Sequence, residues 1–260
     1  MIRSVALPDY APPAAGPDHG VLRLDIGLAV RWLGLAVAGV IAASLAGSLS
    51  LVHLGLTRQD VPELREQVPM MLKLLLKFDA GGEQTVTAWL SSMILLLCAT
   101  VLLHIARAER RGGGVDAWHW LGLAIIFCGL SIDEAVGLHE MTINPVREAF
   151  GASGMFRYAW VIPAMMFVAL VGLACLGFLL RLEATFRLRF LVAAALFVGG
   201  AVGFEMMEGA LATFYSQHQL IYEAAVNLED ALEFAGELVF LHSLLLYARR
   251  YARSVRIRLA

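Results

Sequence analysis

Six stretches of this chain are about 20 or more residues long and mostly apolar. A helix needs about 20 apolar residues to cross the hydrocarbon core of a bilayer. The whole composition agrees, since 59% of the 260 residues are apolar and only 16% are charged. The sequence therefore predicts an all-α integral membrane helical bundle of six transmembrane helices. Their expected ranges are about 30–55, 87–107, 118–142, 158–181, 189–214 and 221–248.

Positive charge in the loops indicates how the bundle is oriented, because Lys and Arg are enriched in cytoplasmic loops. Arginines gather before the first span, between spans two and three, between spans four and five, and after span six. The loop after span five has neither Lys nor Arg. We therefore expect both termini to be cytoplasmic. The first outer loop is an exception, since it carries Arg58, Arg65, Lys73 and Lys77.

The chain divides into three expected parts. Residues 1–25, with four prolines, are expected to form a disordered cytoplasmic tail. Residues 26–250 form the six-helix transmembrane domain, and residues 251–260 form a basic cytoplasmic tail. In the first outer loop, the pattern over residues 61–78 predicts a short amphipathic helix. This helix either lies on the outer leaflet or packs over the mouth of the bundle.

Three of the six predicted spans carry clusters of acids, which constrain function most. The clusters read CGLSIDEAVGLHE (128–140), VGFEMMEGA (202–210) and NLEDALEFAGELVFLH (227–242). An ionised carboxylate at the bilayer centre costs from a few to more than ~10 kcal/mol. These acids must therefore face one another, hold a cation, share protons or line a wet cavity.

Depth in the membrane brings the three clusters to one level. In the expected orientation, Asp133 lies about nine residues below the outer end of its span. An α-helix rises about 1.5 Å per residue, so residue counts give depths in the membrane. Glu205 and Glu208 lie about seven to ten residues below that surface, and Glu229 and Glu233 about eight to twelve. We therefore expect a single pocket in the outer half of the membrane, open toward the outer face and closed toward the cytoplasm.

Helical phase and small residues support the same pocket. At 100° per residue, Asp133 and Glu140 share one face of the third span, with Gly137 between them. Small residues let membrane helices approach closely. Glycines near the acids are therefore expected at helix contacts, namely Gly129, Gly137, Gly203, Gly209 and Gly236.

Carboxylates and an imidazole from several facing helices are typical ligands of a divalent cation. We therefore expect one or two ions, of Fe, Mn or Zn. The expected ligands are Asp133, Glu134, His139, Glu140, Glu205, Glu208, Glu229 and Glu233. At the outer mouth or behind these ligands we expect Asp79, Glu83, Asp230, Glu237 and His242. The sequence points to no catalytic residue.

The kind of metal site stays open. Di-iron proteins built on helical bundles use Glu-x-x-His motifs. Here Glu134 and His139 are five residues apart, which weakens that analogy unless the helix carries a π-bulge there.

Two further interpretations of the acids remain open: a relay for protons or cations, and a structural network of hydrogen-bonded carboxyl groups. A conduction path should continue to the cytoplasmic side, where only Glu237, His242 and Ser243 extend inward. A pocket with one open end therefore fits better. It favours a metal-dependent oxidoreductase or hydrolase acting on a lipid-like or membrane-soluble substrate. The expected partners are the lipid bilayer and that substrate, with no nucleic acid, and the oligomeric state stays open.

Three stretches together resemble a group of uncharacterised bacterial inner-membrane proteins: KFDAGGEQTVTAWLSSMILLL (77–97), LSIDEAVGLHE (130–140) and NLEDALEFAGELVFLHSLLLY (227–247). That group shares an FD-x-x-GE segment, an S-x-DE-x-x-x-LHE helix and a late Glu-rich helix. The resemblance implies a location in the bacterial inner membrane. It also implies that acids of all three stretches, and His139, belong to a shared pattern. These residues are Asp79, Glu83, Asp133, Glu134, His139, Glu140, Glu229, Glu233 and Glu237.

Overall fold

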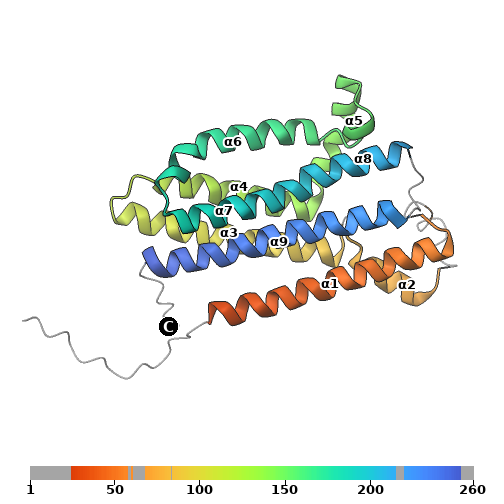
Figure 1. Cartoon of the computed structure of the whole chain (residues 1–260), viewed down its shortest axis with the longest axis horizontal. Coiled ribbons are helices and arrows are strands. Elements are labelled where there is room, and N and C mark those ends of the chain that lie inside the picture. The colour runs from red at the N-terminus through yellow and green to blue at the C-terminus, as the bar shows by residue number, and fades with distance from the viewer. Residues whose placement is uncertain (1–24, 58–59, 61–67, 83, 215–219, 253–260) are drawn as a thin grey trace, which may run out of the picture.

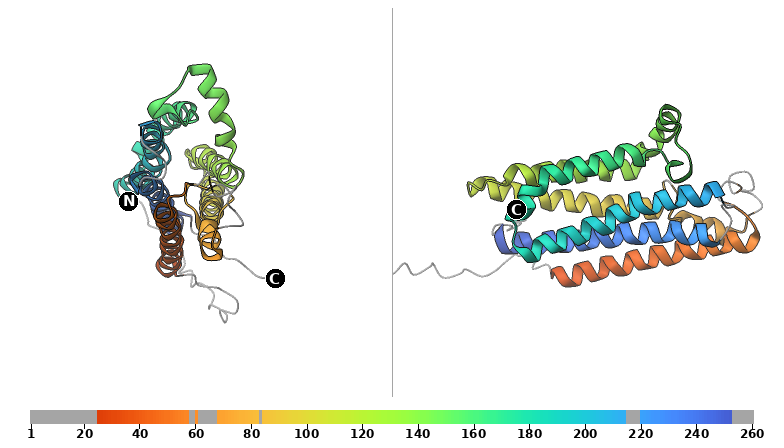
Figure 2. Two further views of the ribbon diagram at one scale, coloured as in Figure 1. Left: turned by 90° about the vertical axis from the view of Figure 1, so that its right-hand side faces the viewer. Right: turned by 45° about the horizontal axis from the view of Figure 1, so that its top comes forward.

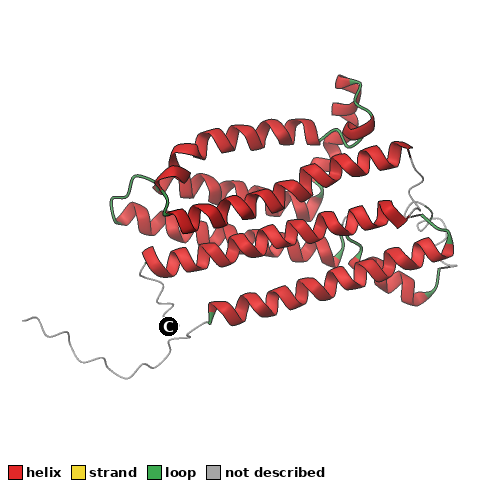
Figure 3. Cartoon of the chain, viewed as in Figure 1, coloured by secondary structure: helices red, strands yellow, loops and turns green. Residues whose placement is uncertain are grey.

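The computed structural model of the chain describes residues 25–57, 60, 68–82, 84–214 and 220–252. All regular elements in this part of the chain are helices (Figure 3). Six of them are long and apolar enough to cross a membrane, which confirms the six predicted spans. Their bounds are Ile26–Leu54 (α1), Val86–Arg111 (α3), Ala117–Val136 (α4), Val161–Arg181 (α6), Ala184–Phe214 (α7, η3 and α8) and Leu220–Tyr251 (α9).

The six long helices run side by side and alternate in direction (Figure 1). The start of α1 and the end of α9 lie at the same end of the bundle, which we call the terminal end. The opposite end, where α1 ends and α3 begins, is called the acid end. Helix α9 is central and packs against α1, α3 and α7, while α4 packs on α3. Both predicted tails lie almost wholly outside the described residues, and the orientation in the membrane stays a prediction.

Local capping explains where several helices begin and end. The Asp25 side chain accepts a hydrogen bond of 3.1 Å from the Leu28 N–H and so caps the start of α1. Gly55 ends α1 in the left-handed conformation. Thr85 caps α3 by accepting a bond from the Ala88 N–H. The ends of these spans are therefore set by short-range chemistry that the sequence contains.

The third predicted span ends earlier than expected. Helix α4 stops at Val136 because Gly137 takes a left-handed conformation, with φ of 63°. The chain then turns into α5 (Leu138–Phe150), which leaves the bundle axis (Figure 1). The prediction of one helix through residue 142 is therefore wrong at this end. Asp133 of α4 and Glu140 of α5 therefore do not share a face of one helix, contrary to the prediction.

The terminal end holds the main aromatic core. Trp120 of α4 is 1% exposed and meets the rings of Phe178 (4.8 Å), Phe190 (6.1 Å) and Tyr247 (4.8 Å between centroids). Phe186 of α7 adds an edge contact with Tyr247 at 5.2 Å. Four helices are thus joined by aromatic contacts, which are worth about 0.5–1.5 kcal/mol each beyond their buried area.

The described part of the segment between α1 and α3 packs on α1. It contains α2 (Met70–Leu75) and η1 (Leu76–Phe78). Leu72 is buried in a small cluster with Leu51 and Val68, whereas Met71 is 68% exposed. Residues 61–67 of the predicted amphipathic helix lie outside the described residues.

Candidate functional site

One cavity of about 540 Å³ runs between α4, α5, α6, α9 and the helix formed by α7, η3 and α8. This volume is in the range of small-molecule binding sites. All eight residues predicted as ligands line it: Asp133, Glu134, His139, Glu140, Glu205, Glu208, Glu229 and Glu233. Side chains separated by up to about one hundred residues in the chain therefore share one wall.

The five residues expected around the ligands have different positions. Asp230 and Glu237 also line the cavity. Asp79 directly precedes Ala80, Gly81 and Gly82, which line it at the acid end. Glu83 lies outside the described residues. His242 is not among the residues that line the described cavity.

The charged residues that line the cavity are almost all acidic. Its acids are Asp133, Glu134, Glu140, Glu205, Glu208, Glu229, Asp230, Glu233 and Glu237, and His139 is its one imidazole. No Lys or Arg occurs among the described residues that line it. Protons, His139 or a cation that enters the cavity would therefore offset negative charge on these nine acids.

Asp133 and His139 form a pair at the turn between α4 and α5. The Asp133 carboxylate accepts a hydrogen bond of 2.8 Å from the His139 backbone N–H. Its second oxygen lies 2.9 Å from Nδ1 of the His139 ring. The same ring also meets Trp160, with 4.7 Å between centroids. The left-handed turn at Gly137 brings the pair together, which explains why a straight-helix projection missed it.

A second group of acids joins α8 to α9. Glu205 begins α8 and lies beside Trp160 and Glu229, while Glu229 also adjoins Glu208. Glu208 and Glu229 are both buried. Carboxyl groups this close in a nonpolar setting repel one another when ionised, so shared protons or a cation must stabilise them.

Two tyrosines also lie at the acid end of the cavity. The hydroxyls of Tyr158 and Tyr222 are 2.9 Å apart, and both residues line the cavity. Burial raises the pKa of the Tyr158 hydroxyl above its ordinary value, while the hydrogen bond with Tyr222 lowers it. Neither tyrosine is among the site residues predicted from the sequence. A Tyr just before a span is common at a membrane interface, so no sequence signal separates this pair from such tyrosines.

Among the cavity acids of α9, Glu237 lies farthest toward the terminal end. It is 1% exposed, and the Ser91 hydroxyl donates a hydrogen bond of 2.6 Å to its Oε1. Its Oε2 is buried and has no hydrogen-bond partner among the described residues. Such an atom costs about 1–3 kcal/mol if nothing satisfies it. Glu237 is therefore poised to interact with an occupant of the cavity or to carry a proton.

A π-helical turn, Gly199–Phe204, directly precedes Glu205. Turns of this kind are frequent at functional sites, where they redirect the side chains that follow. Gly200 permits the turn to approach α9, since an added Cβ would lie 2.8 Å from the Glu229 carbonyl oxygen. The Gly-Gly pair at 199–200 is the feature of the sequence from which a break in the regular α-helix could have been predicted.

The glycines expected at helix contacts fall into two groups. Gly236 and Gly209 do lie at close contacts, with an added Cβ 2.7 Å and 3.0 Å from the backbone of neighbouring elements. An added Cβ at Gly129 or Gly203 would meet nothing within 4 Å, so the expectation is wrong for both. Gly137 serves the turn after α4 instead.

Beyond the acids, the cavity wall becomes apolar. Aromatic and aliphatic side chains of α4, α6, α7 and α9 line this part, which extends as far as Trp120 and Phe178 at the terminal end. The cavity is therefore amphiphilic along its length, with carboxyl groups at the acid end and hydrocarbon toward the terminal end.

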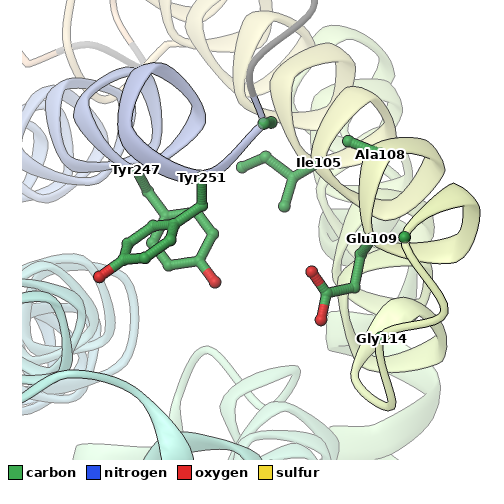
Figure 4. A pocket seen from close by; sticks show the side chains of 8 residues that line it. Ile105, Ala108, Glu109, Gly114, Tyr247 and Tyr251 are labelled. Atoms are coloured by element: carbon green, nitrogen blue, oxygen red, sulfur yellow. The ribbon is translucent and has the colours of Figure 1, made fainter. Parts of the chain in front are cut away.

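A smaller cavity of about 140 Å³ lies at the terminal end (Figure 4). Its wall includes Glu109, Tyr247 and Tyr251, and Figure 4 shows the Glu109 carboxyl facing the two tyrosine rings across the space. It contains one acid and lies far along the bundle from the acid cluster, so the two cavities are separate features.

The arrangement of ligating groups is less compact than the sequence predicts for a metal centre. Among the residues that the structure describes, no group of three or more His, Cys, Asp or Glu side chains is positioned to hold a metal ion. The eight predicted ligands share a cavity but do not converge on one point. Metal binding would therefore require side chains to rotate toward the ion.

Residues 32–248 match the family model described as "Domain of unknown function (DUF8692)". The chain belongs to this family. The match includes at least the greater part of each of the six long helices and every acid of the DUF8692 cavity, so the site is part of the family domain itself. No curated protein and no solved structure matches the chain.

Proposed function

We propose that this DUF8692 protein binds one or two divalent metal ions, of Fe, Mn or Zn, at the acid end of its cavity. There they would act on a lipid-like or membrane-soluble substrate in the inner membrane. The observation that carries the proposal is the wall of nine acids and one histidine without Lys or Arg. A cation at this place offsets the cost of ionised carboxylates in a low-dielectric setting, which is otherwise several kcal/mol or more.

The ligand types suit a borderline cation. Carboxylate oxygens with one imidazole nitrogen are found in Fe, Mn and Zn sites. The nitrogen available here is the His139 ring, whose Nδ1 is held by Asp133 at 2.9 Å. A carboxylate bonded to one ring nitrogen of a histidine is common behind metal ligands, where it sets the orientation of the ring. In this arrangement Asp133 would orient His139, and Glu205 and Glu229 would supply oxygen ligands.

Elemental analysis of protein purified in mild detergent tests the proposal. Wild type is expected to hold metal in whole-number stoichiometry, and Glu205→Gln and Glu233→Gln are each expected to lose it. Glu223→Gln is the matched control, since Glu223 is another buried acid of α9 but lies outside the cavity wall. Wild type without metal, or loss in the control as large as in the two variants, would overturn the proposal.

A second candidate function is a proton or cation relay. The position of Glu237 favours it, because this buried acid extends the cluster toward the terminal end. Beyond Glu237 the described cavity wall is apolar and aromatic, however, which favours a pocket that is closed at that end. Flux of protons or cations into liposomes, abolished by Glu237→Gln, would support the relay over the metal site.

A further inference from the structure

Helix α6 is attached to the bundle at its two ends. At the terminal end, Arg181 pairs with Asp116 beside the start of α4, with Nε 3.2 Å and 3.3 Å from the two carboxylate oxygens. Phe178, one turn before Arg181, stacks on His119 of α4 at 5.2 Å between centroids. These contacts fix the distance between α4 and α6 at this end.

At the acid end, contacts of the preceding loop hold the start of α6. The Arg147 guanidinium of α5 donates bonds of 2.9 Å and 2.6 Å to the Arg157 carbonyl oxygen. Trp160, directly before α6, meets His139. Both ends of the helix are therefore anchored, and neither anchor lies in the middle of the membrane.

Between these anchors, α6 stands away from α4 (Figure 2). Gly172 of α6 lines the cavity, yet an added Cβ there would meet nothing within 4 Å. On α4, Phe127 stacks on Phe240 of α9 at 4.6 Å and so turns to the central helix rather than to α6. The side of the cavity between α4 and α6 is therefore open along the middle of the spans, where lipid chains would lie.

The end of the cavity, by contrast, is covered in part by the turn at residues 79–82. Ala80, Gly81 and Gly82 line the cavity there. The Ala80 N–H donates to the Ser44 hydroxyl at 2.8 Å, and the Thr87 hydroxyl donates to the Phe78 carbonyl at 2.7 Å. These bonds tie the turn to α1 and α3. The lateral side, which this turn does not cover, is thus the way in for a molecule that is dissolved in the membrane.

We infer that a long-chain amphiphile whose head carries no negative charge enters this cavity sideways from the bilayer, between α4 and α6. Its chain would lie along the apolar wall, beside Phe167, Val168 and Val171 of α6. Its head would lie among the nine acids, where an amine or a hydroxyl can bond to carboxyl groups. A phosphate head would be repelled by the nine acids, because no Lys or Arg lines the described wall to offset their charge.

This inference rests on the membrane location within the proposed function but not on the metal. The test uses wild-type protein in phosphatidylcholine nanodiscs and three photoreactive probes. The probes share one diazirine-bearing alkyl chain and carry an amine, a hydroxyl or a phosphate head. Mass spectrometry then maps the labelled residues. Labelling by the amine and hydroxyl probes is expected on cavity-lining residues of α6 and α7, at least about tenfold above the phosphate probe, a ratio that corresponds to ~1.4 kcal/mol.

Two matched variants test the route of entry. Gly172→Phe fills the open side of the cavity, and labelling should fall at least about tenfold. Gly129→Phe is its control, because an added Cβ at Gly129 is equally unhindered but Gly129 does not line the cavity. Ala164→Phe and Ala169→Phe repeat the comparison within α6, since Ala164 lines the cavity and Ala169 does not.

The outcomes separate this inference from the proposed metal site. Equal labelling by the phosphate probe would overturn the assignment of the head. Labelling unchanged in both Gly172→Phe and Ala164→Phe would overturn the lateral entrance. Metal content, measured on the same samples, should stay at the wild-type value in both blocking variants. Cavity labelling without any bound metal would therefore reject the metal site and leave the lateral entrance standing.

Discussion

The two ends of the bundle differ in what fills the space between the helices. At the terminal end, Trp120, Phe178, Phe190 and Tyr247 fill the space between four helices with aromatic rings. At the acid end, the same helices enclose carboxyl groups and a cavity. The first region gains dispersion contacts, whereas the second keeps polar groups that cost free energy in a membrane.

The difference indicates that one end of each helix serves stability and the other end serves binding. Helices α4, α6, α7 and α9 contribute side chains to both regions. A bundle that is held firmly at one end tolerates poor packing at the other, as ligand sites generally require. Substitutions at the terminal end should therefore alter stability, and substitutions at the acid end should alter binding with smaller effects on stability.

The largest effect is expected from Trp120→Ala. Loss of this buried ring removes contacts with three helices, so the free energy of unfolding should fall by about 3–5 kcal/mol. Trp118→Ala is the control, since Trp118 is 70% exposed and two residues away, and its effect should stay within about 0.5 kcal/mol. Chemical unfolding in mild detergent measures both. Similar losses in the two variants would contradict a structural core at the terminal end.

Gly236→Ala should destabilise the contact between α7 and α9. The added Cβ would lie 2.7 Å from the Phe197 backbone nitrogen, and overpacking of this kind costs about 1–3 kcal/mol. Gly203→Ala is the matched variant, with nothing within 4 Å of the added atom. Its stability should equal or exceed that of wild type, because Ala favours helix over Gly by about 1 kcal/mol. The same unfolding measurement decides, and a neutral Gly236→Ala would show that α9 can shift away from α7.

Ser91→Ala tests whether the hydrogen bond from Ser91 to Glu237 stabilises the folded protein. It removes the donor to Glu237 and leaves a buried acceptor, which costs about 1–3 kcal/mol. Thr100→Ala on the same helix is the control, because the exposed Thr100 hydroxyl bonds only to the Leu96 carbonyl one turn earlier. If an occupant or a water satisfies Glu237 instead, Ser91→Ala will resemble the control in unfolding experiments.

The six spans were predictable because a bilayer imposes length and apolarity on each helix. That the predicted ligands share one cavity was also foreseeable from depth alone, since helices of one bundle present side chains at matching levels. Glu205, Glu229 and Glu233 illustrate this, because they lie on two helices and still share one wall.

Local backbone departures were not predictable in this way. The left-handed Gly137 ends α4 and brings Asp133 to His139, and the π-helical turn at Gly199–Phe204 sets the position of Glu205. A projection at 100° per residue assumes an unbroken α-helix, so it fails at both places. The space between α4 and α6 was beyond sequence reasoning too, because it depends on anchors such as Arg181 and Asp116 that lie at the helix ends.

The smallest effect is expected from Tyr158→Phe, which removes the hydroxyl pair with Tyr222. Near neutral pH this should cost about 0.5–1.5 kcal/mol. The pH dependence gives a sharper test. Burial raises the pKa of Tyr158 above 10.0 in the folded protein, so folding favours the neutral phenol. The contribution of the hydroxyl is therefore complete below pH 10.0 and is lost as the pH rises through the raised value. Unfolding of both proteins at pH 8 to 12, in steps of about one unit, should show wild type losing its advantage only above pH 10.0. A constant difference across this range would place Tyr158 in water, and the acid end would then be more open than its cavity wall indicates.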